Sequence, residues 1–234
     1  MKLFLGLFLL LLQCELASAT IKEDFTSPVT TDAKYVVIGG SLTLVTVLVF
    51  KKQIGDPFQS ETVEDKPLGH TSTYGDLAGQ LIPNALYVLG ESVAGMNGNP
   101  EGYRRATGMF KASLYSSVVT NALKYTVREQ RPNHGARNSF PSGHTTTAFA
   151  FAGYVLEEHG WPWGVPALAL GTFVGYSRIN DNKHYLDDVV AGATIGLGYG
   201  IGISKVDRGK GSHNVTFAPI YDHDTKGIVC VAEF

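Results

Sequence analysis

The segment "SFPSGHTTTAF", residues 139–149, combines features that are unusual at the start of a helix. Pro141 and Gly143 interrupt the chain, whereas the run 145–151 is small and apolar and predicts a buried helix. His144 is the first side chain with acid–base chemistry, and it lies at the break. A helix N-terminus can bind an anion because it carries unpaired N–H groups and a partial positive charge. The segment therefore predicts either an ordinary capped helix or a histidine placed beside a bound anion.

The composition limits the classes of protein to consider. At 234 residues the chain is long enough for one domain with a sizeable core. Its net charge is −2 and it has no basic run, which argues against a nucleic-acid partner. Only 17% of the residues are charged and 27 are glycine. We therefore expect a chain that packs tightly or contacts a membrane.

The N-terminus has the pattern of a secretory signal peptide over residues 1–19. Lys2 precedes the apolar run 3–12, and the small residues 17–19 form a cleavage pattern. The apolar run is too short to span a bilayer as a stable helix. We predict export with a mature chain that starts near Thr20, and an uncleaved anchor is the alternative.

The rest of the chain predicts an all-α fold, a bundle of about six helices within residues 20–205. Alternating strand-like segments after residue 206 predict a linker and a β-hairpin tail over 206–234. The polar stretch 53–74 contains two prolines and is predicted to be a loop. The predicted helices cover 35–50, 76–94 with an interruption at Pro83, 104–129, 144–157, 165–177 and 186–203.

The sequence gives divided evidence about a membrane. The run 35–50 has about 16 apolar residues, near the lower limit for a spanning helix. Lys51 and Lys52 follow it and suit a cytoplasmic end. The helix predicted over 104–129 carries five polar or basic residues in its first 21 positions, so it can span a bilayer only if these face the protein interior. We predict a membrane-embedded bundle, and a soluble exported bundle is the alternative.

Two further stretches carry groups that can bind an anion or transfer a proton. In "KYTVREQRP", Lys124 and Arg131 are seven residues apart and would return to about the same face of a helix, within roughly 20°. Pro132 is expected to end that helix. Two cations at a helix end can clamp an anion, although a solvated basic face that includes Arg128 is the plainer interpretation.

The second stretch is "SRINDNKHYLDDVVAG", residues 177–192. Arg178 precedes His184, which is followed three and four positions later by Asp187 and Asp188. On a helix that starts here, either carboxylate can reach the imidazole. A carboxylate bonded to one ring nitrogen fixes the tautomer and leaves the other nitrogen nucleophilic. An ordinary acidic first turn is the alternative.

Taken together, the three stretches resemble the signature of the type 2 phosphatidic-acid phosphatase superfamily. This superfamily also contains bacterial class A acid phosphatases and vanadium haloperoxidases. The resemblance covers residues 124 to 188, and the predicted helices suit the helical core of the superfamily. It rests on Lys124, Arg131 and Pro132, then on Pro141, Ser142, Gly143 and His144, and finally on Ser177, Arg178, His184 and Asp188.

The resemblance implies a phosphate-binding cradle. Lys124, Arg131 and Arg178 would hold the three non-bridging oxygens of a phosphoryl group. Ser142 and the N–H of Gly143 would complete the cradle. Positioning and charge neutralisation are most of what phosphoryl transfer asks of a protein. No metal and no other cofactor is expected, since three cationic side chains take the place of a metal.

The resemblance also implies the roles of the histidines. His184 would attack phosphorus and form a phosphohistidine, and Asp188, rather than Asp187, would orient it. His144 would protonate the leaving oxygen and then activate water.

Several activities and locations fit these residues. A lipid phosphate at the outer face of a bilayer is the predicted substrate, with the enzyme in the inner membrane and its site facing the periplasm. A soluble periplasmic acid phosphatase that acts on small phosphomonoesters is the alternative. A haloperoxidase would need vanadate in the same cradle, and a catalytically silent membrane protein would have kept the fold alone.

Overall fold

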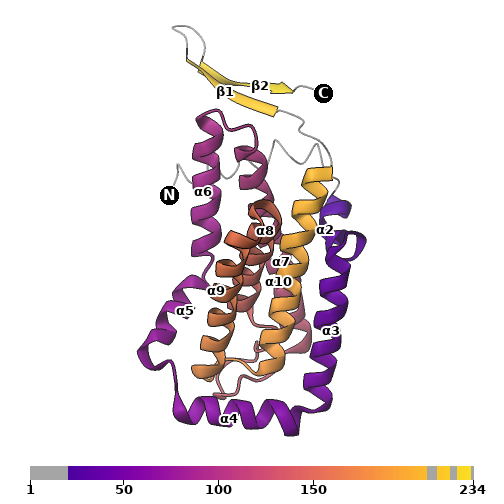
Figure 1. The fold of residues 1–234 in the computed structure, drawn as a ribbon, viewed down its shortest axis with the longest axis vertical. Helices are drawn as coiled ribbons and strands as arrows, with labels where there is room; N and C mark the ends of the chain where they lie inside the picture. Colours follow the sequence, from indigo (N-terminus) through magenta and orange to yellow (C-terminus); the bar gives the residue numbers. More distant parts are fainter. Residues whose placement is uncertain (1–20, 210–214, 222–225, 233–234) are drawn as a thin grey trace.

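The computed structural model describes residues 21–209 and two strands at 215–221 and 226–232, and within these ranges nearly all regular structure is helical (Figure 1). A π-helical turn at Lys51–Gly55 follows α3, and a 3₁₀ turn at Gly69–Thr71 precedes α5. The α-helices are α2 (Ile21–Thr30), α3 (Ala33–Val49), α4 (Asp56–Asp65), α5 (Ser72–Ala78), α6 (Ile82–Met96), α7 (Gly102–Val127), α8 (Gly143–His159), α9 (Trp161–Asn180) and α10 (Leu186–Gly209).

The long helices form a bundle in which α8 and α10 lie closest together. Small residues make this approach possible, because a Cβ at Gly196 would lie 2.3 Å from the carbonyl oxygen of Thr146. One turn later, a Cβ at Gly200 would lie 2.5 Å from the carbonyl oxygen of Ala150. The high glycine content therefore serves close helix packing in this part of the chain. The core beside the contact is built from fully buried side chains, among them Met109, Tyr154, Val174 and Ile203.

The prediction of about six helices was too low, since the structure describes nine α-helices over 21–209. The stretch predicted to be a loop, 53–74, contains α4. Its proline, Pro57, lies in the first turn, where a missing N–H costs nothing. This helix was missed because it is mostly polar and has no apolar periodicity. The interruption predicted near Pro83 is confirmed, as α5 and α6 are separated at residues 79–81 and Pro83 lies in the first turn of α6.

The ends of the chain are only partly described. The predicted signal peptide, 1–19, lies outside the described residues, and the division into three parts stays a prediction. Helix α10 continues to Gly209, four residues past the predicted end of the helical domain at 205. Beyond it, β1 (Val215–Tyr221) pairs antiparallel with β2 (Lys226–Ala232), with Val215 opposite Ala232.

One described helix, α10, is long and apolar enough to cross a membrane. Helices α2 and α3 meet the same criterion only as a pair, and the chain bends by 61° between them. Over half of the apolar window in α10 is buried inside the bundle, as in the core helices of soluble proteins. The surface of α3 is different, because Tyr35, Leu42 and Val49 each expose more than 60% of their area.

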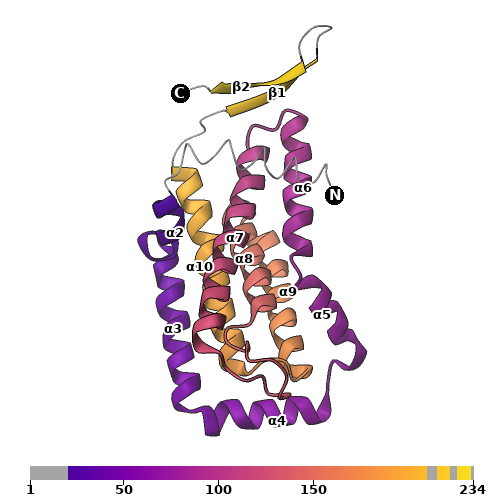
Figure 2. The ribbon, with the colours of Figure 1, turned by 180° about the vertical axis from the view of Figure 1, so that it is seen from behind.

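The predicted motifs meet at one end of the bundle. Helix α7 ends there, α8 begins there, α9 ends there and α10 begins there (Figure 2). Both views show α4 lying across this same end. Residues that are separated by up to 64 positions in the sequence, from 124 to 188, can therefore share one site.

Candidate active site

His184 and Asp188 form a buried pair where the loop after α9 meets the start of α10. The Asp188 carboxylate oxygen Oδ2 lies 3.2 Å from His184 Nδ1. The same oxygen accepts hydrogen bonds from Ser139 Oγ, at 2.5 Å, and from the Tyr185 backbone N–H, at 2.8 Å. His184 is 2% exposed and Asp188 is fully buried. With Nδ1 assigned as the protonated nitrogen, Nε2 keeps a free lone pair.

The position of the His184 ring is fixed by the backbone as well. The N–H groups of Lys183 and His184 both donate to the carbonyl oxygen of Arg178, at 3.0 and 3.3 Å. Burial lowers the pKa of His184 below its ordinary value, and the Asp188 carboxylate only partly opposes this. The imidazole is therefore held neutral near pH 7, which is the form that can act as a nucleophile.

A cavity of about 410 Å³ opens in front of this pair. We call it the histidine cavity. Four of the residues predicted from the sequence line it, and they come from three separate parts of the chain. The lining consists of the predicted residues Arg131, His144, Arg178 and His184, together with Thr73, Asp76, Asp181 and Lys183.

Asp76 of α5 is the residue in this cavity that sequence reasoning missed. One of its carboxylate oxygens, Oδ1, forms an ion pair with Arg178 and lies 3.3 Å from His144 Nε2. Its only signal in the sequence was an acidic residue in a predicted helix outside the motifs. The carboxylate therefore occupies a position between the two cationic or protonatable groups where an anionic substrate oxygen could bind.

Lys124 and Arg131 meet near the site, but for a different reason from the one predicted. Helix α7 ends at Val127, and Arg128 adopts a left-handed conformation, so Arg131 does not lie on the same helix face as Lys124. Both side chains instead bind Asn138. Lys124 Nζ donates to the backbone oxygen of Asn138 at 2.6 Å, and Arg131 Nε donates to its Oδ1 at 2.9 Å.

Ser142 and Gly143 lie behind and beside the histidine cavity, respectively. Ser142 is the fully buried N-cap of α8, but its side chain forms no capping bond and its Oγ accepts a hydrogen bond from Thr145 at 2.9 Å. The backbone N–H of Ser142 donates to the Asp188 carbonyl oxygen at 3.0 Å, which ties α8 to α10. Gly143 lines a neighbouring cavity of about 220 Å³ together with Lys124 and His144. We call this the connecting cavity.

The structure distinguishes the two aspartates at the start of α10. Asp187 points to Lys51, with 3.5 Å between Oδ1 and Nζ, whereas Asp188 contacts His184. Glu129 also pairs with Lys51, at 3.9 Å, and burial beside the two aspartates raises its pKa. The three carboxylates offer oxygen atoms within 4.8 Å of one another, as a metal ion would require. The Lys51 ammonium already contacts two of them, so part of this charge is neutralised without a metal.

Residues 106–211 match the model of the PAP2 superfamily. The matched part of the chain belongs to this superfamily. The resemblance predicted from the three motifs is thus confirmed, and the matched region contains every residue of those motifs.

The similar proteins with curated names include lipid phosphatases. The lipid A 1-phosphatase of Porphyromonas gingivalis is 44% identical over 82 residues, which cover 34% of this chain and 18% of that protein. The lipid A 4'-phosphatase of Helicobacter pylori is 33% identical over 70 residues, which cover 30% of this chain and 35% of that protein. The chain thus spans less than half of the length of these relatives.

A solved structure shows that the fold is that of a PAP2 phosphatase. The transmembrane PAP2-type phosphatidylglycerolphosphate phosphatase from Bacillus subtilis superposes with a TM-score of 0.55 at 18% sequence identity. The superposition covers 75% of this chain and 97% of that protein. The all-helical prediction is confirmed by this likeness.

Proposed function

We propose that the chain is a phosphatase that removes a phosphate group from a phosphorylated membrane lipid, through a phosphohistidine and without a metal ion. The observation that carries this proposal is the buried His184–Asp188 pair, which faces a cavity lined by Arg131, Arg178 and a second histidine, His144. The names of the relatives, lipid A 1-phosphatase and lipid A 4'-phosphatase, support a phosphorylated lipid as the substrate class.

In the first step, His184 Nε2 attacks phosphorus and the bond from phosphorus to the leaving oxygen breaks. His144 donates a proton to that oxygen, so the leaving group departs as an alcohol. The positive charge that develops on the His184 ring is stabilised by the Asp188 carboxylate. Arg131 and Arg178 hold the phosphoryl oxygens during this transfer.

In the second step, a water molecule gives its proton to His144 and its oxygen attacks phosphorus. The bond between phosphorus and Nε2 breaks, which releases inorganic phosphate and restores neutral His184. Lys124 shares in neutralising the phosphoryl charge by turning its ammonium group from the Asn138 carbonyl. Ser142 and the Gly143 N–H complete the cradle from the start of α8, where the helix dipole favours an anion.

The exposed apolar surface supports a place in the membrane. Soluble monomers rarely expose large continuous apolar areas, and α3 presents such side chains on most of its circumference. Trp161 and Trp163, at the end of the bundle opposite the site, are 69% and 67% exposed, as expected at a membrane interface. Helix α7 has 26 residues and is about 39 Å long, sufficient for the hydrocarbon layer.

The predicted export signal supports a site on the periplasmic side of the inner membrane. Lys51 and Lys52 gave the opposite indication, because they suit a cytoplasmic end and yet Lys51 lies at the same end as the site. The two expectations cannot both be right. The ion pairs of Lys51 with Asp187 and Glu129 give this lysine a structural role, so it carries little information about orientation.

The proposal is tested with the purified protein on lipid and soluble phosphates, with and without detergent, by release of inorganic phosphate. We expect hydrolysis of lipid phosphates in detergent, resistance to EDTA and inhibition by orthovanadate. The His184→Ala protein should carry no label from a ³²P-labelled aryl phosphate, while the His144→Ala protein should accumulate an acid-labile one. Loss of activity in EDTA that Mg²⁺ restores would contradict the metal-free mechanism. Activity on small phosphomonoesters alone, in a protein that needs no detergent, would favour the soluble alternative.

A further inference from the structure

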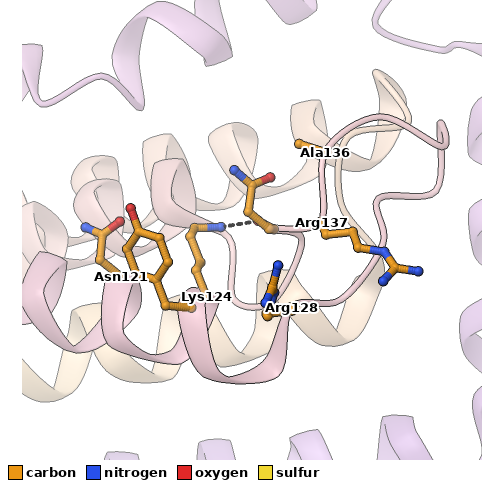
Figure 3. Close-up of a pocket in the computed structure, with 7 residues that line it drawn as sticks. Asn121, Lys124, Arg128, Ala136 and Arg137 are labelled. Carbon is orange, nitrogen blue, oxygen red and sulfur yellow. Dashed lines mark hydrogen bonds between the residues drawn. The ribbon is translucent and has the colours of Figure 1, made fainter.

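A third cavity, of about 520 Å³, lies next to the connecting cavity (Figure 3). We call it the arginine cavity. Figure 3 shows Lys124 and Arg128 side by side at the end of α7, with Arg137 extending outward from the facing loop. No carboxylate lines it. Its walls are Asn121, Lys124, Tyr125, Arg128, Ala136, Arg137 and Asn138.

The positive charge of this cavity is not neutralised by the part of the chain that the structure describes. No ion pair joins Arg128 or Arg137 to a carboxylate within residues 21–209, and Arg137 Nε donates only to the amide oxygen of Gln130, at 3.2 Å. Two arginines and a lysine around one hollow are a strong attraction for an anion, and arginine suits phosphate in particular.

The backbone at Arg128 adds a second observation. Arg128 has a φ of 53° at the C-terminal end of α7, a conformation that glycine or asparagine adopts at lower cost. An arginine side chain therefore stands at a position where the backbone alone would favour a smaller residue. The basic group that we first interpreted as part of a solvated face projects over a cavity instead.

The three cavities adjoin in series. Lys124 and Asn121 line both the arginine cavity and the connecting cavity, and His144 lines both the connecting cavity and the histidine cavity. In the proposed reaction His144 protonates the leaving oxygen. The leaving group therefore extends from His144 into the connecting cavity and on toward Arg128.

We propose that the arginine cavity binds a second phosphate group, one that stays on the leaving group of the substrate. Arg128 is one helical turn beyond Lys124, a rise of about 6 Å. The second phosphate is therefore separated from the scissile one by a few bonds, as across a three-carbon bridge. This inference rests on the proposed function, because the direction of the leaving group follows from the role of His144.

The test compares 1,3-propanediol bisphosphate with propyl phosphate as substrates of the wild-type protein and of Arg128→Asn. Asparagine suits the left-handed backbone, so this variant is expected to fold. Lys66→Asn is the matched control, since Lys66 also has a positive φ, 43°, at the end of a helix and lines none of the three cavities. We expect Arg128→Asn to raise KM for the bisphosphate about tenfold, from the loss of a charged hydrogen bond, and to leave propyl phosphate nearly unchanged. Arg128→Lys should restore part of the preference.

Three outcomes overturn the inference. The first is an equal loss on both substrates, and the second is a bisphosphate preference that survives in Arg128→Asn. The third is a response of propyl phosphate hydrolysis to added inorganic phosphate or to phosphatidylglycerol in the micelle that disappears in Arg128→Asn, since the cavity would then serve a free anion or a neighbouring lipid. If the wild type hydrolyses neither substrate, the proposed function fails. Calorimetric binding of the bisphosphate then decides the inference alone, which stands only if Arg128→Asn weakens that binding and Lys66→Asn does not.

Discussion

Replacing Asp188 by asparagine or by alanine should have very different effects on catalysis. Oδ2 of Asp188 accepts three hydrogen bonds, from His184 Nδ1, Ser139 Oγ and the Tyr185 N–H. The Tyr185 N–H can only donate, so an asparagine side chain should place its carbonyl oxygen there and its NH₂ at Oδ1. Oδ1 has no hydrogen-bond partner among the described residues, so the amide meets no obstacle.

In Asp188→Asn the orientation and tautomer of His184 are then kept and only the negative charge is lost. A charged hydrogen bond contributes about 1.5–3 kcal/mol and a neutral one about 1 kcal/mol. The difference corresponds to a decrease of about tenfold to a hundredfold in the rate of phosphorylation. Asp188→Ala removes the acceptor, so the ring can adopt the wrong tautomer, and a decrease of about 10³ to 10⁴ is expected.

The assay is single-turnover phosphorylation of the protein by an aryl phosphate, with thermal unfolding to measure the folded fraction. Asp187→Asn is the matched control, because that carboxylate contacts Lys51 and should change the rate only a few fold. Equal losses in folded Asp188→Asn and Asp188→Ala would refute the argument that Tyr185 fixes the amide. A larger effect of Asp187→Asn would show that the partner of His184 has been misassigned.

Two further predictions concern the two histidines. The lowered pKa of His184 means that the neutral nucleophile persists to lower pH than in an ordinary histidine, so the acidic limb of kcat/KM should lie below about pH 6.5. Since the Asp188 carboxylate raises this pKa, Asp188→Asn should move the limb to still lower pH; a move to higher pH would contradict this. A Cβ at Gly79 would lie 2.6 Å from the Cβ of His144, so Gly79→Ala should displace the proton donor and slow alkyl phosphates more than aryl phosphates. Gly39→Ala, with nothing within 4 Å, should leave both rates unchanged.

The sequence predicted which residues meet, because the order of helices places the end of one and the start of the next at the same end of an antiparallel bundle. The pair His184 and Asp188 also followed from helical spacing alone. The contact between Lys124 and Arg131 did not follow from spacing, since α7 ends at Val127. It depends on Asn138, whose carbonyl and side-chain oxygens bind one cation each. Periodicity has no term for such a loop residue.

The helices that the sequence missed are those with little apolar patterning. Helix α4 is largely polar, so neither its length nor its direction across the end of the bundle could be predicted from periodicity. Asp76 was missed for a related reason. Its partner Arg178 is 102 positions away, and a long-range ion pair leaves no signal in the local sequence.

The motif residues all lie within 106–211, but the site is completed by residues outside that region. Asp76 contacts His144 and Arg178, and the absence of a side chain at Gly79 makes room for the His144 ring. The wall of the connecting cavity that a leaving group would touch is formed in part by residues 79–81. The phosphoryl group, in contrast, meets only residues of the motifs and Asp76. Exchange of α5 and the start of α6 between superfamily members should therefore change which leaving group is accepted, while the phosphoryl chemistry stays with the helices that carry the motifs.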